Sequence, residues 1–415
     1  MRFRFIHAAD LHLDSPLQGL SRKSQDFSAR VDDASRQAFD NLIALAIAEQ
    51  CRLIVIAGDV FDGQWKSYHT GLFFAERMRR LSEHGVRVVM ILGNHDAANP
   101  FAGRLELSGN VTVLPSNRPG SAIFEDIGVA VHGQSFPQRE VTENIALGYP
   151  APVSGLFNIG LLHTAGSGRE GHASYAPCSV EQLANHGYAY WALGHIHTRE
   201  TLSTTPHILF PGNLQSRSIR EPGAKGASLV TVEDGVVTSV EHRPLDVVRF
   251  AVETIDVAAL NDREGLFAAI RASAEGALAA ADGRALALRL NLAGAAALHA
   301  DLVTNAQDLR EEIETVLASV DSDIWLEKLC LRTSPPLALA SVDPTVAGGL
   351  RTAIEALSQG NWLEERLAAK LAEIKTKLPA GAHADRFFAQ MKAEGAECAR
   401  TLALALIEKG GADAL

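Results

Sequence analysis

Cysteine and basic charge are both scarce in this sequence, and their scarcity limits what the protein can be. The chain of 415 residues has four cysteines, and no two of them form a CxxC pair. That spacing excludes a recognisable zinc finger or disulfide framework and is typical of a reducing compartment. The formal net charge is −11, which excludes a simple basic nucleic-acid binder. Any contact with nucleic acid must therefore come from a local patch or a bound metal ion.

Long hydrophobic runs and low-complexity tracts are also lacking. The residues after Met1 contain no extended apolar segment, so we expect no secretory signal. The long uncharged stretch over residues 144–168 contains Pro150, Pro152 and His163, which makes it a poor membrane span. Hydrophobic residues make up 47% of the chain and charged residues 21%, as in a folded protein with a core. We expect a cytoplasmic protein that does not enter the membrane.

What the sequence does have is a series of short aliphatic runs, each followed by a polar or glycine-rich turn. Such runs are typical of buried strands. Apolar residues at helical spacing predict helices over residues 33–50 and 70–84. This alternation predicts an α/β architecture, in which ligand sites lie beyond the carboxyl ends of the strands. The clearest predicted strands are Leu53–Ala57, Val86–Leu92, Gly160–Leu162 and Tyr190–Leu193.

The pattern changes near Pro244, after which no further motif for chemistry follows. We therefore expect three parts: a principal domain over residues 1–245, a smaller α+β unit over 246–333, and a mostly helical region over 334–415. Within the α+β unit, the expected strands are 247–255 and 286–292, and the expected helices are 263–280 and 309–319.

Polar residues that could bind metal follow the predicted strands in five blocks. Alternate residues of an extended segment point the same way, so an Asp-x-His or His-x-His block can aim two ligands at one region. Each block alone also suits an ordinary strand end or turn, but five in order are hard to explain as structural accidents. Carboxylate, imidazole and amide oxygen together suit Mn²⁺, Fe²⁺ or Zn²⁺. The seven ligand candidates are Asp10, His12, Asp59, Asn94, His163, His195 and His197.

These blocks resemble those of the calcineurin-like metallophosphoesterase superfamily, over about residues 1–245. The resemblance implies a four-layer αββα sandwich with a two-metal site at the sheet ends. Within the superfamily, the opening segment 5–14, the block 58–62 and Pro211-Gly212-Asn213 are similar to the SbcD/YhaO-like DNA repair exonucleases. Those nucleases carry a small capping domain and a helical C-terminal segment, which fits the two appended parts.

The resemblance also assigns roles to individual residues. It implies that His95 lies over the phosphate, where it protonates the leaving oxygen or stabilises the transition-state charge. Asp96 would orient His95, or would instead cap a helix that starts after the turn. The two implied metal sites share Asp59, because a carboxylate can bridge two ions that clamp a phosphoryl group. One site would comprise Asp10, His12, Asp59 and His197, and the other Asp59, Asn94, His163 and His195.

One position departs from the pattern of some related nucleases. They carry a second active-site histidine three residues after the bridging aspartate, and this chain has Asp62 there. A carboxylate does not donate a proton at neutral pH, and it repels DNA phosphates unless it binds an ion. Asp62 therefore weighs against strong exonuclease activity on duplex ends.

Basic residues beyond the predicted site give the best candidates for DNA contact. Arg217, Arg220 and Lys225 flank Pro211-Gly212-Asn213 and could hold backbone phosphates. The alternative is a solvated loop in which Glu221 partly balances their charge.

An apolar stripe in the predicted C-terminal helices raises the question of partners. It suits packing within the chain, or a docking helix for another protein. In the resembled family, the partner is an SMC-like coiled-coil ATPase, and a homodimer is also implied. This chain has no GxxxxGK[ST] motif, so any ATP dependence must come from a partner. The stripe comprises Trp362, Leu363, Leu367, Leu371 and Ile374.

Three functions are compatible with these observations. The first, which we expect, is a DNA nuclease with two divalent ions, preferably Mn²⁺ with Fe²⁺ or Zn²⁺ as alternatives. The second is a metallophosphoesterase for a small molecule or nucleotide. The third is a DNA-end-binding or ATPase-regulating subunit with a weakened site, for which Asp62 is the best support. The presence of all seven ligand candidates and of His95 argues against the third.

Overall fold

The computed structural model describes most of the chain. It covers residues 2–17, 33–62, 68–97, 105–166 and 175–336, with a few further positions between 365 and 395. The chain divides into two compact units. The first comprises Met1–Ala251 together with Ala281–Ala287, and the second comprises Val252–Ala280 together with Leu288–Leu415.

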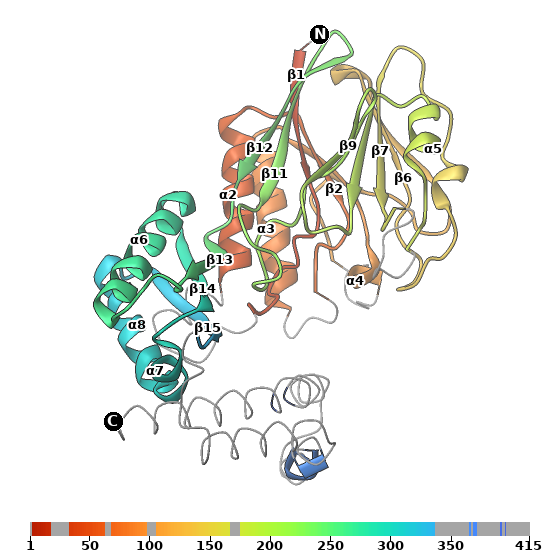
Figure 1. Cartoon of the computed structure of the whole chain (residues 1–415). Coiled ribbons are helices and arrows are strands. Elements are labelled where there is room, and N and C mark those ends of the chain that lie inside the picture. The colour runs from red at the N-terminus through yellow and green to blue at the C-terminus, as the bar shows by residue number, and fades with distance from the viewer. Residues whose placement is uncertain are drawn as a thin grey trace, which may run out of the picture. The chain divides into compact units, whose positions relative to one another are not determined.

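Two six-stranded sheets form the centre of the first unit (Figure 1). In the first sheet, β1 to β4 run parallel, β11 pairs antiparallel with β1, and β12 pairs antiparallel with β11. In the second sheet, β6, β7, β8 and β10 run parallel, and β5 and β9 are antiparallel edge strands. The first sheet comprises, in spatial order, β12 (Val236–Pro244), β11 (Gly226–Glu233), β1 (Arg2–Ala8), β2 (Leu53–Ala57), β3 (Arg87–Ile91) and β4 (Val111–Val113). The second comprises β5 (Gly120–Phe124), β6 (Val129–Gly133), β7 (Phe157–His163), β8 (Tyr190–Gly194), β10 (His207–Phe210) and β9 (Glu200–Thr204).

Helices cover the outer faces of both sheets. Phe39 of α2 and Phe74 of α3 join Ile56 of β2 in one apolar cluster, and Leu183 of α5 joins Trp191 of β8 in another. The layers therefore run helix, sheet, sheet, helix, which confirms the predicted four-layer α/β architecture. The helices and helical turns of this unit are α2 (Ala34–Ala48), α3 (His69–Glu83), α4 (Asn94–Ala97), η2 (Glu125–Ile127), η3 (Ile145–Gly148) and α5 (Val180–Asn185).

The space between the sheets is filled by apolar side chains from both of them. β2 is buried along its whole length, as its aliphatic run predicts. The rings of Phe5 and Tyr190 meet edge to face, with centroids 5.1 Å apart. At the end of β7, His163 donates through Nδ1 to the carbonyl of Ala57 at the end of β2, over 2.9 Å. The carboxyl ends of strands from both sheets therefore lie together at one edge of the sandwich.

His7 is a buried histidine in this core, and it makes stability depend on pH. Its Nδ1 lies 3.1 Å from the Tyr190 hydroxyl, and its Nε2 lies 3.1 Å from the Leu193 carbonyl. Burial lowers the pKa of His7 to about 3 from its ordinary 6.5. The unfolded chain thus binds a proton below pH 6.5 that the folded chain rejects, so stability falls as the pH falls through 6.5.

We expect this residue to cost about 2 kcal/mol of stability between pH 7 and pH 5. Urea unfolding of metal-free protein at both pH values, on the natural chain and on His7→Gln, measures the effect. The natural chain should lose about 2 kcal/mol more than the variant. Equal losses in the two proteins would contradict the assignment.

The second unit contains most of a three-stranded sheet in the order β13-β14-β15, whose first two strands begin in the first unit. Leu288, Leu290 and Leu292 alternate along β14 and are fully buried, and α8 buries apolar residues at four-residue spacing. The four elements expected from the sequence are observed as β13, α6, β14 and α8. The elements are β13 (Val248–Asp256), α6 (Arg263–Ala281), β14 (Ala285–Ala295), α7 (His299–Thr304), α8 (Ala306–Val320) and β15 (Ile324–Ser334).

β15 is absent from the sequence prediction because Glu327 and Lys328 interrupt its aliphatic pattern. The structure gives Glu327 a partner, since it accepts two hydrogen bonds of 2.7 Å from Arg289 of β14. The domain limits at 245 and 333 remain predictions. No helix in the described ranges is both long and apolar enough to cross a bilayer. Of the predicted apolar stripe, Leu371 is described and buried, whereas Trp362, Leu363, Leu367 and Ile374 lie outside the described residues.

Candidate metal centre

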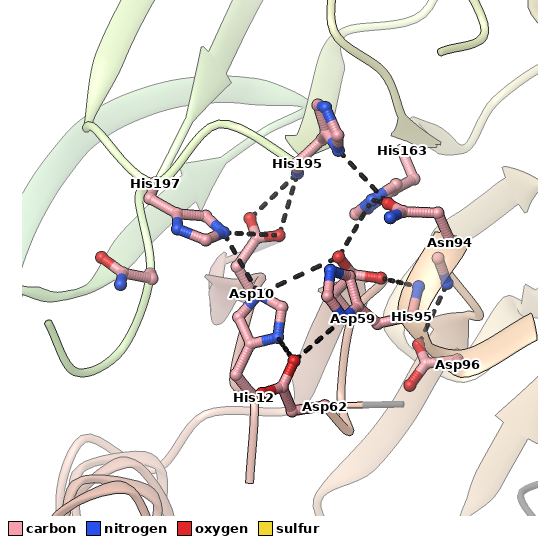
Figure 2. A network of polar contacts seen from close by, with 12 residues as sticks. Asp10, His12, Asp59, Asp62, Asn94, His95, Asp96, His163, His195 and His197 are labelled. Carbon is pink, nitrogen blue, oxygen red and sulfur yellow. Dashed lines mark hydrogen bonds and ion pairs between the residues drawn. The ribbon is translucent and has the colours of Figure 1, made fainter. Parts of the chain in front are cut away.

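All seven ligand candidates lie at the edge where the carboxyl ends of the strands meet. Figure 2 shows their side chains converging on one region, with His197 on one side of it and His163 on the other. His163 is the last residue of β7, and Asn94 begins α4 directly beyond β3. The loop after β1 supplies Asp10 and His12, the loop after β2 supplies Asp59, and the loop after β8 supplies His195 and His197.

The backbone at four of these ligands is strained. Asp10, His12, Asp59 and His195 have φ angles of 52°, 43°, 53° and 97°, in a region that residues other than glycine rarely adopt. Each such residue costs on the order of 1–3 kcal/mol and persists only where the surroundings hold it. Here neighbouring loops do so, since the Asp10 amide donates to the Gly58 carbonyl over 3.0 Å. Strain of this kind clusters at functional sites.

One group of possible ligand atoms comes from Asp10, His12 and His197. The Nε2 atoms of His12 and His197 lie 3.1 Å apart, and His197 Nε2 lies 3.8 Å from an oxygen of Asp10. His12 and Asp10 are almost completely buried. Two imidazole nitrogens that face each other at this distance are suited to a shared cation.

The second group comes from Asp59, His163 and His195, and the side-chain oxygen of Asn94 lies beside it. That oxygen is 2.9 Å from His163 Nε2 and 3.3 Å from His195 Nδ1. Oδ2 of Asp59 lies 3.4 Å from His163 Nε2 and 3.9 Å from His12 Nε2. Asp59 therefore stands between the two groups, as a bridging carboxylate would.

The hydrogen bonding of His163 tests whether a cation fits here. Because its Nδ1 donates to a backbone carbonyl, a neutral His163 turns the lone pair of Nε2 toward the Asn94 oxygen. Two acceptors 2.9 Å apart need a proton or a metal ion between them. Burial opposes protonation of His163, but the carboxylates of Asp59 and Asp10 outweigh it and raise the pKa of His163 to about 9. The donor set thus fits a divalent ion, and the fit does not single out which one.

His95 lies beside these groups and is held by Asp62. Its Nδ1 is 2.9 Å from Oδ1 of Asp62, and this bond raises the pKa of His95 above its ordinary value. The same oxygen lies 3.6 Å from Nδ1 of His12, which has no hydrogen bond, and 3.6 Å from Nη1 of Arg217. The side chain of His95 is 31% exposed, so it is accessible to a molecule at the site. His12, Asp62 and His95 also form a third cluster of possible ligand atoms.

Comparison with known proteins agrees with this geometry. Residues 3–199 match the family model described as "Calcineurin-like phosphoesterase". The chain carries a calcineurin-like phosphoesterase domain. Residues 250–334 match a second model, described as "Metallophosphoesterase YhaO, middle domain". Metallophosphoesterases bind divalent metals, and the described residues include groups that could hold such ions.

Three relatives show how far the similarity reaches. "Uncharacterized metallophosphoesterase YhaO" of Bacillus subtilis is 37% identical over 63% of this chain and 65% of its own length. "DNA double-strand break repair protein Mre11" of Methanopyrus kandleri is 26% identical over 47% and 44%. A subunit of the nuclease SbcCD of Escherichia coli is 24% identical over 58% and 67%. The chain thus spans about two thirds of the first and third relatives and less than half of the second.

Within the phosphoesterase domain, the Asp96 carboxylate is hydrogen-bonded to the backbone, whereas the ring of His95 meets Asp62. The buried carboxylate of Asp96 accepts from the backbone amides of Val60, Phe61 and Gly93, at 3.1, 2.8 and 3.0 Å. It therefore ties the loop after β2 to the turn after β3, and Asp62 is the residue that holds His95. The two roles predicted for Asp96, orienting His95 or capping a helix, stay predictions.

Glu221 is a residue of the first unit that the sequence analysis treats only as a counter-charge. One of its oxygens accepts from Nδ1 of His197 over 2.7 Å, and the other accepts from the Arg217 amide over 2.8 Å. The bond from Nδ1 leaves the lone pair of His197 Nε2 facing the first ligand group. Burial opposes ionisation of Glu221, but His197 and Arg217 outweigh it and lower its pKa to about 2.

The three basic candidates for DNA contact differ in their surroundings. Arg217 is partly exposed and lies between Asp62 and Glu221, and Arg220 is exposed. Lys225 is buried, and its ammonium donates to the carbonyl of His197 over 2.8 Å. In this structure Lys225 therefore supports the ligand loop from inside the protein.

Removing the Glu221 carboxylate should weaken metal binding by the phosphoesterase domain. We expect Glu221→Gln to reduce the affinity for Mn²⁺ about 10- to 100-fold, since it replaces the acceptor that orients His197. Isothermal titration of metal-free protein with Mn²⁺ measures the change. Glu181→Gln, at an exposed position of α5, is the matched control and should bind as the natural chain does. Equal affinities for the two variants would contradict this role.

Proposed function

We propose that the protein is a two-metal phosphodiesterase that cleaves DNA. The observation that carries the proposal is the place of Asp59 between two ligand groups, with His95 beside them. When bound, two such metal ions would activate a water molecule and neutralise charge on a phosphoryl group. The first ion would be held by Asp10, His12, Asp59 and His197, and the second by Asp59, Asn94, His163 and His195.

His95 is the residue that we assign to the proton transfer. Asp62 accepts from Nδ1 of His95, which leaves Nε2 to face the phosphoryl group. From there it donates a proton to the leaving oxygen or a hydrogen bond to a phosphoryl oxygen. In this assignment Asp62 orients His95 and stabilises its protonated form, so the carboxylate assists the reaction.

The choice of DNA as substrate rests on the basic loop and on the relatives. Arg217 and Arg220 lie on the loop that also orients His197, where guanidinium groups can contact backbone phosphates. Two of the relatives carry the names of a DNA repair protein and a nuclease. A small phosphoester is the alternative substrate, because the same ligand groups would serve it.

Several finer assignments belong to the same proposal. We assign Mn²⁺ to the site, with Fe²⁺ or Zn²⁺ as alternatives, because the donors are carboxylate, imidazole and amide oxygen. The name of the Escherichia coli relative marks it as one subunit of a nuclease. By analogy we assign this chain an SMC-like coiled-coil ATPase as partner, a homodimeric state and a cytoplasmic location.

Hydrolysis by protein loaded with Mn²⁺ tests the proposal. The substrates are end-labelled single-stranded DNA, end-labelled double-stranded DNA and bis-p-nitrophenyl phosphate, each assayed with and without EDTA. Metal-dependent cleavage of DNA and of the small ester is expected. Hydrolysis of the ester with intact DNA would contradict DNA as the substrate of this chain and favour a small phosphoester. No hydrolysis of any substrate, with two ions bound, would favour a regulatory subunit.

A further inference from the structure

The loop from Asn213 to Lys225 contacts the metal centre on one side and the start of β13 on the other. On the side of the metal centre its contacts include the following. Glu221 holds His197, Lys225 donates to the His197 carbonyl, and Arg217 lies 3.6 Å from Asp62. The orientation of one metal ligand and of one basic candidate for substrate binding thus depends on where this loop lies.

On its other side the loop is held by the side-chain amide of Gln215. Its oxygen accepts from the backbone amides of Val247 and Val248, at 2.9 and 3.3 Å. Its nitrogen donates to the carbonyls of Val248 and Ser216, at 2.6 and 3.2 Å. Gln215 is 4% exposed, so water cannot replace these bonds. Both the oxygen and the nitrogen of this amide are therefore hydrogen-bonded. The bonds to Val247 and Val248 lie where β13 begins.

Backbone bonds continue this attachment along the rest of the loop. The Gly223 amide donates to the Phe250 carbonyl over 2.9 Å, and the Leu245 amide donates to the Lys225 carbonyl over 2.8 Å. Asn213 joins the two sides, since its side-chain nitrogen donates both to the Gln215 carbonyl and to Glu221, each over 2.8 Å. A displacement of Gln215 would thus pass to Glu221 through one intervening side chain.

We propose that Gln215 is a positioning residue for the metal centre. Its side-chain hydrogen bonds go to Ser216, Val247 and Val248, and it acts by holding the Asn213–Lys225 loop against β13 so that Glu221 meets His197. In the reaction proposed above, the same contacts keep Arg217 beside Asp62. That part rests on the proposed function, whereas the effect on metal binding does not.

The test compares Gln215→Leu with a matched control, Asn41→Leu. Leucine is close to glutamine in size and removes all four hydrogen bonds. Asn41 of α2 donates one side-chain hydrogen bond to the Leu245 carbonyl, over 2.9 Å, shortly before β13, whereas the loop is bonded to the Leu245 amide. Amide hydrogen exchange of metal-free protein and titration with Mn²⁺ are measured on both variants, together with the melting temperature.

We expect Gln215→Leu to speed exchange within residues 213–225 and to weaken Mn²⁺ binding about 10-fold, at the lower end for outer-shell contacts. Asn41→Leu should change neither. If Gln215→Leu lowers the melting temperature but leaves loop exchange and Mn²⁺ affinity as in the control, the proposal is overturned.

Gln215→Glu is a second test variant for the case that Gln215→Leu does not fold. It keeps an oxygen for the amides of Val247 and Val248 and loses the donor to Val248, so exchange and affinity should fall between those of the natural chain and Gln215→Leu. If only this variant folds, values equal to those of the natural chain overturn the proposal. Both readouts are independent of DNA cleavage. If the natural chain does not cleave DNA but Gln215→Leu still changes loop exchange and Mn²⁺ affinity, only the proposed function is rejected.

Discussion

Replacing Asp59 with asparagine should lower the turnover of a phosphodiester by about 10³-fold or more, with loss of at least one bound ion. Bound metal ions contribute several kcal/mol to the stabilisation of charge in the transition state. A change of about 1.36 kcal/mol corresponds to a factor of ten in rate. Asparagine keeps the oxygen that accepts from the His95 amide over 2.9 Å. It puts an NH₂ group where Oδ2 faces His163 and His12, and that group cannot bind a metal.

Metal stoichiometry and turnover are the two readouts for Asp59→Asn. The natural chain should bind two Mn²⁺ ions and the variant at most one. Asp40→Asn is the control, because it removes a carboxylate that pairs with Arg77 on the helical face and should leave both readouts unchanged. Two tightly bound ions in Asp59→Asn, with turnover intact, would reject Asp59 as the bridging ligand.

Replacing His95 with glutamine should lower turnover about 10²- to 10⁴-fold, the usual contribution of a general acid or base, while two ions remain bound. The reason is that His95 belongs to neither of the two ligand groups around Asp59 and reaches the site through a ring held by Asp62. Glutamine keeps a polar side chain there but cannot deliver a proton. Asp59→Asn and His95→Gln thus separate metal binding from proton transfer.

The control for His95→Gln is His84→Gln, since His84 is exposed and its ring bonds to the nearby Arg80 carbonyl. Its turnover should equal that of the natural chain. A loss of bound metal in His95→Gln would instead assign an ion to the cluster of His12, Asp62 and His95. Unchanged turnover would remove His95 from the mechanism.

The ligand candidates could be predicted from the sequence because each follows a buried strand directly. Parallel strands end at one edge, so residues that follow Ala57 and Ile91 are brought together whatever the length of chain between them. The α/β layers follow from the same aliphatic runs. The resemblance to a known family then supplied what the runs cannot, namely that two sheets face each other.

The partners of these residues could not be predicted in the same way. Asp62 and Asp96 both lie close in sequence to ligand candidates, and only the directions of their side chains decide which one meets His95. Glu221 lies 24 residues from His197, on a loop whose path depends on Gln215 and on β13. The sequence alone places Lys225 on the surface. In the structure its side chain is buried.

The glycines at the strand ends restrict where the substrate preference of this protein can be altered. A Cβ atom on Gly194 would lie 1.9 Å from the Ala57 carbonyl oxygen, and one on Gly93 would lie 2.2 Å from Oδ1 of Asp59. Any side chain at these positions would push the sheets apart or displace the Asp59 carboxylate. A library of variants at Gly93 and Gly194 would therefore yield inactive clones. Diversity introduced at Arg217 and Arg220, the proposed contacts with the substrate, would leave both glycines unchanged.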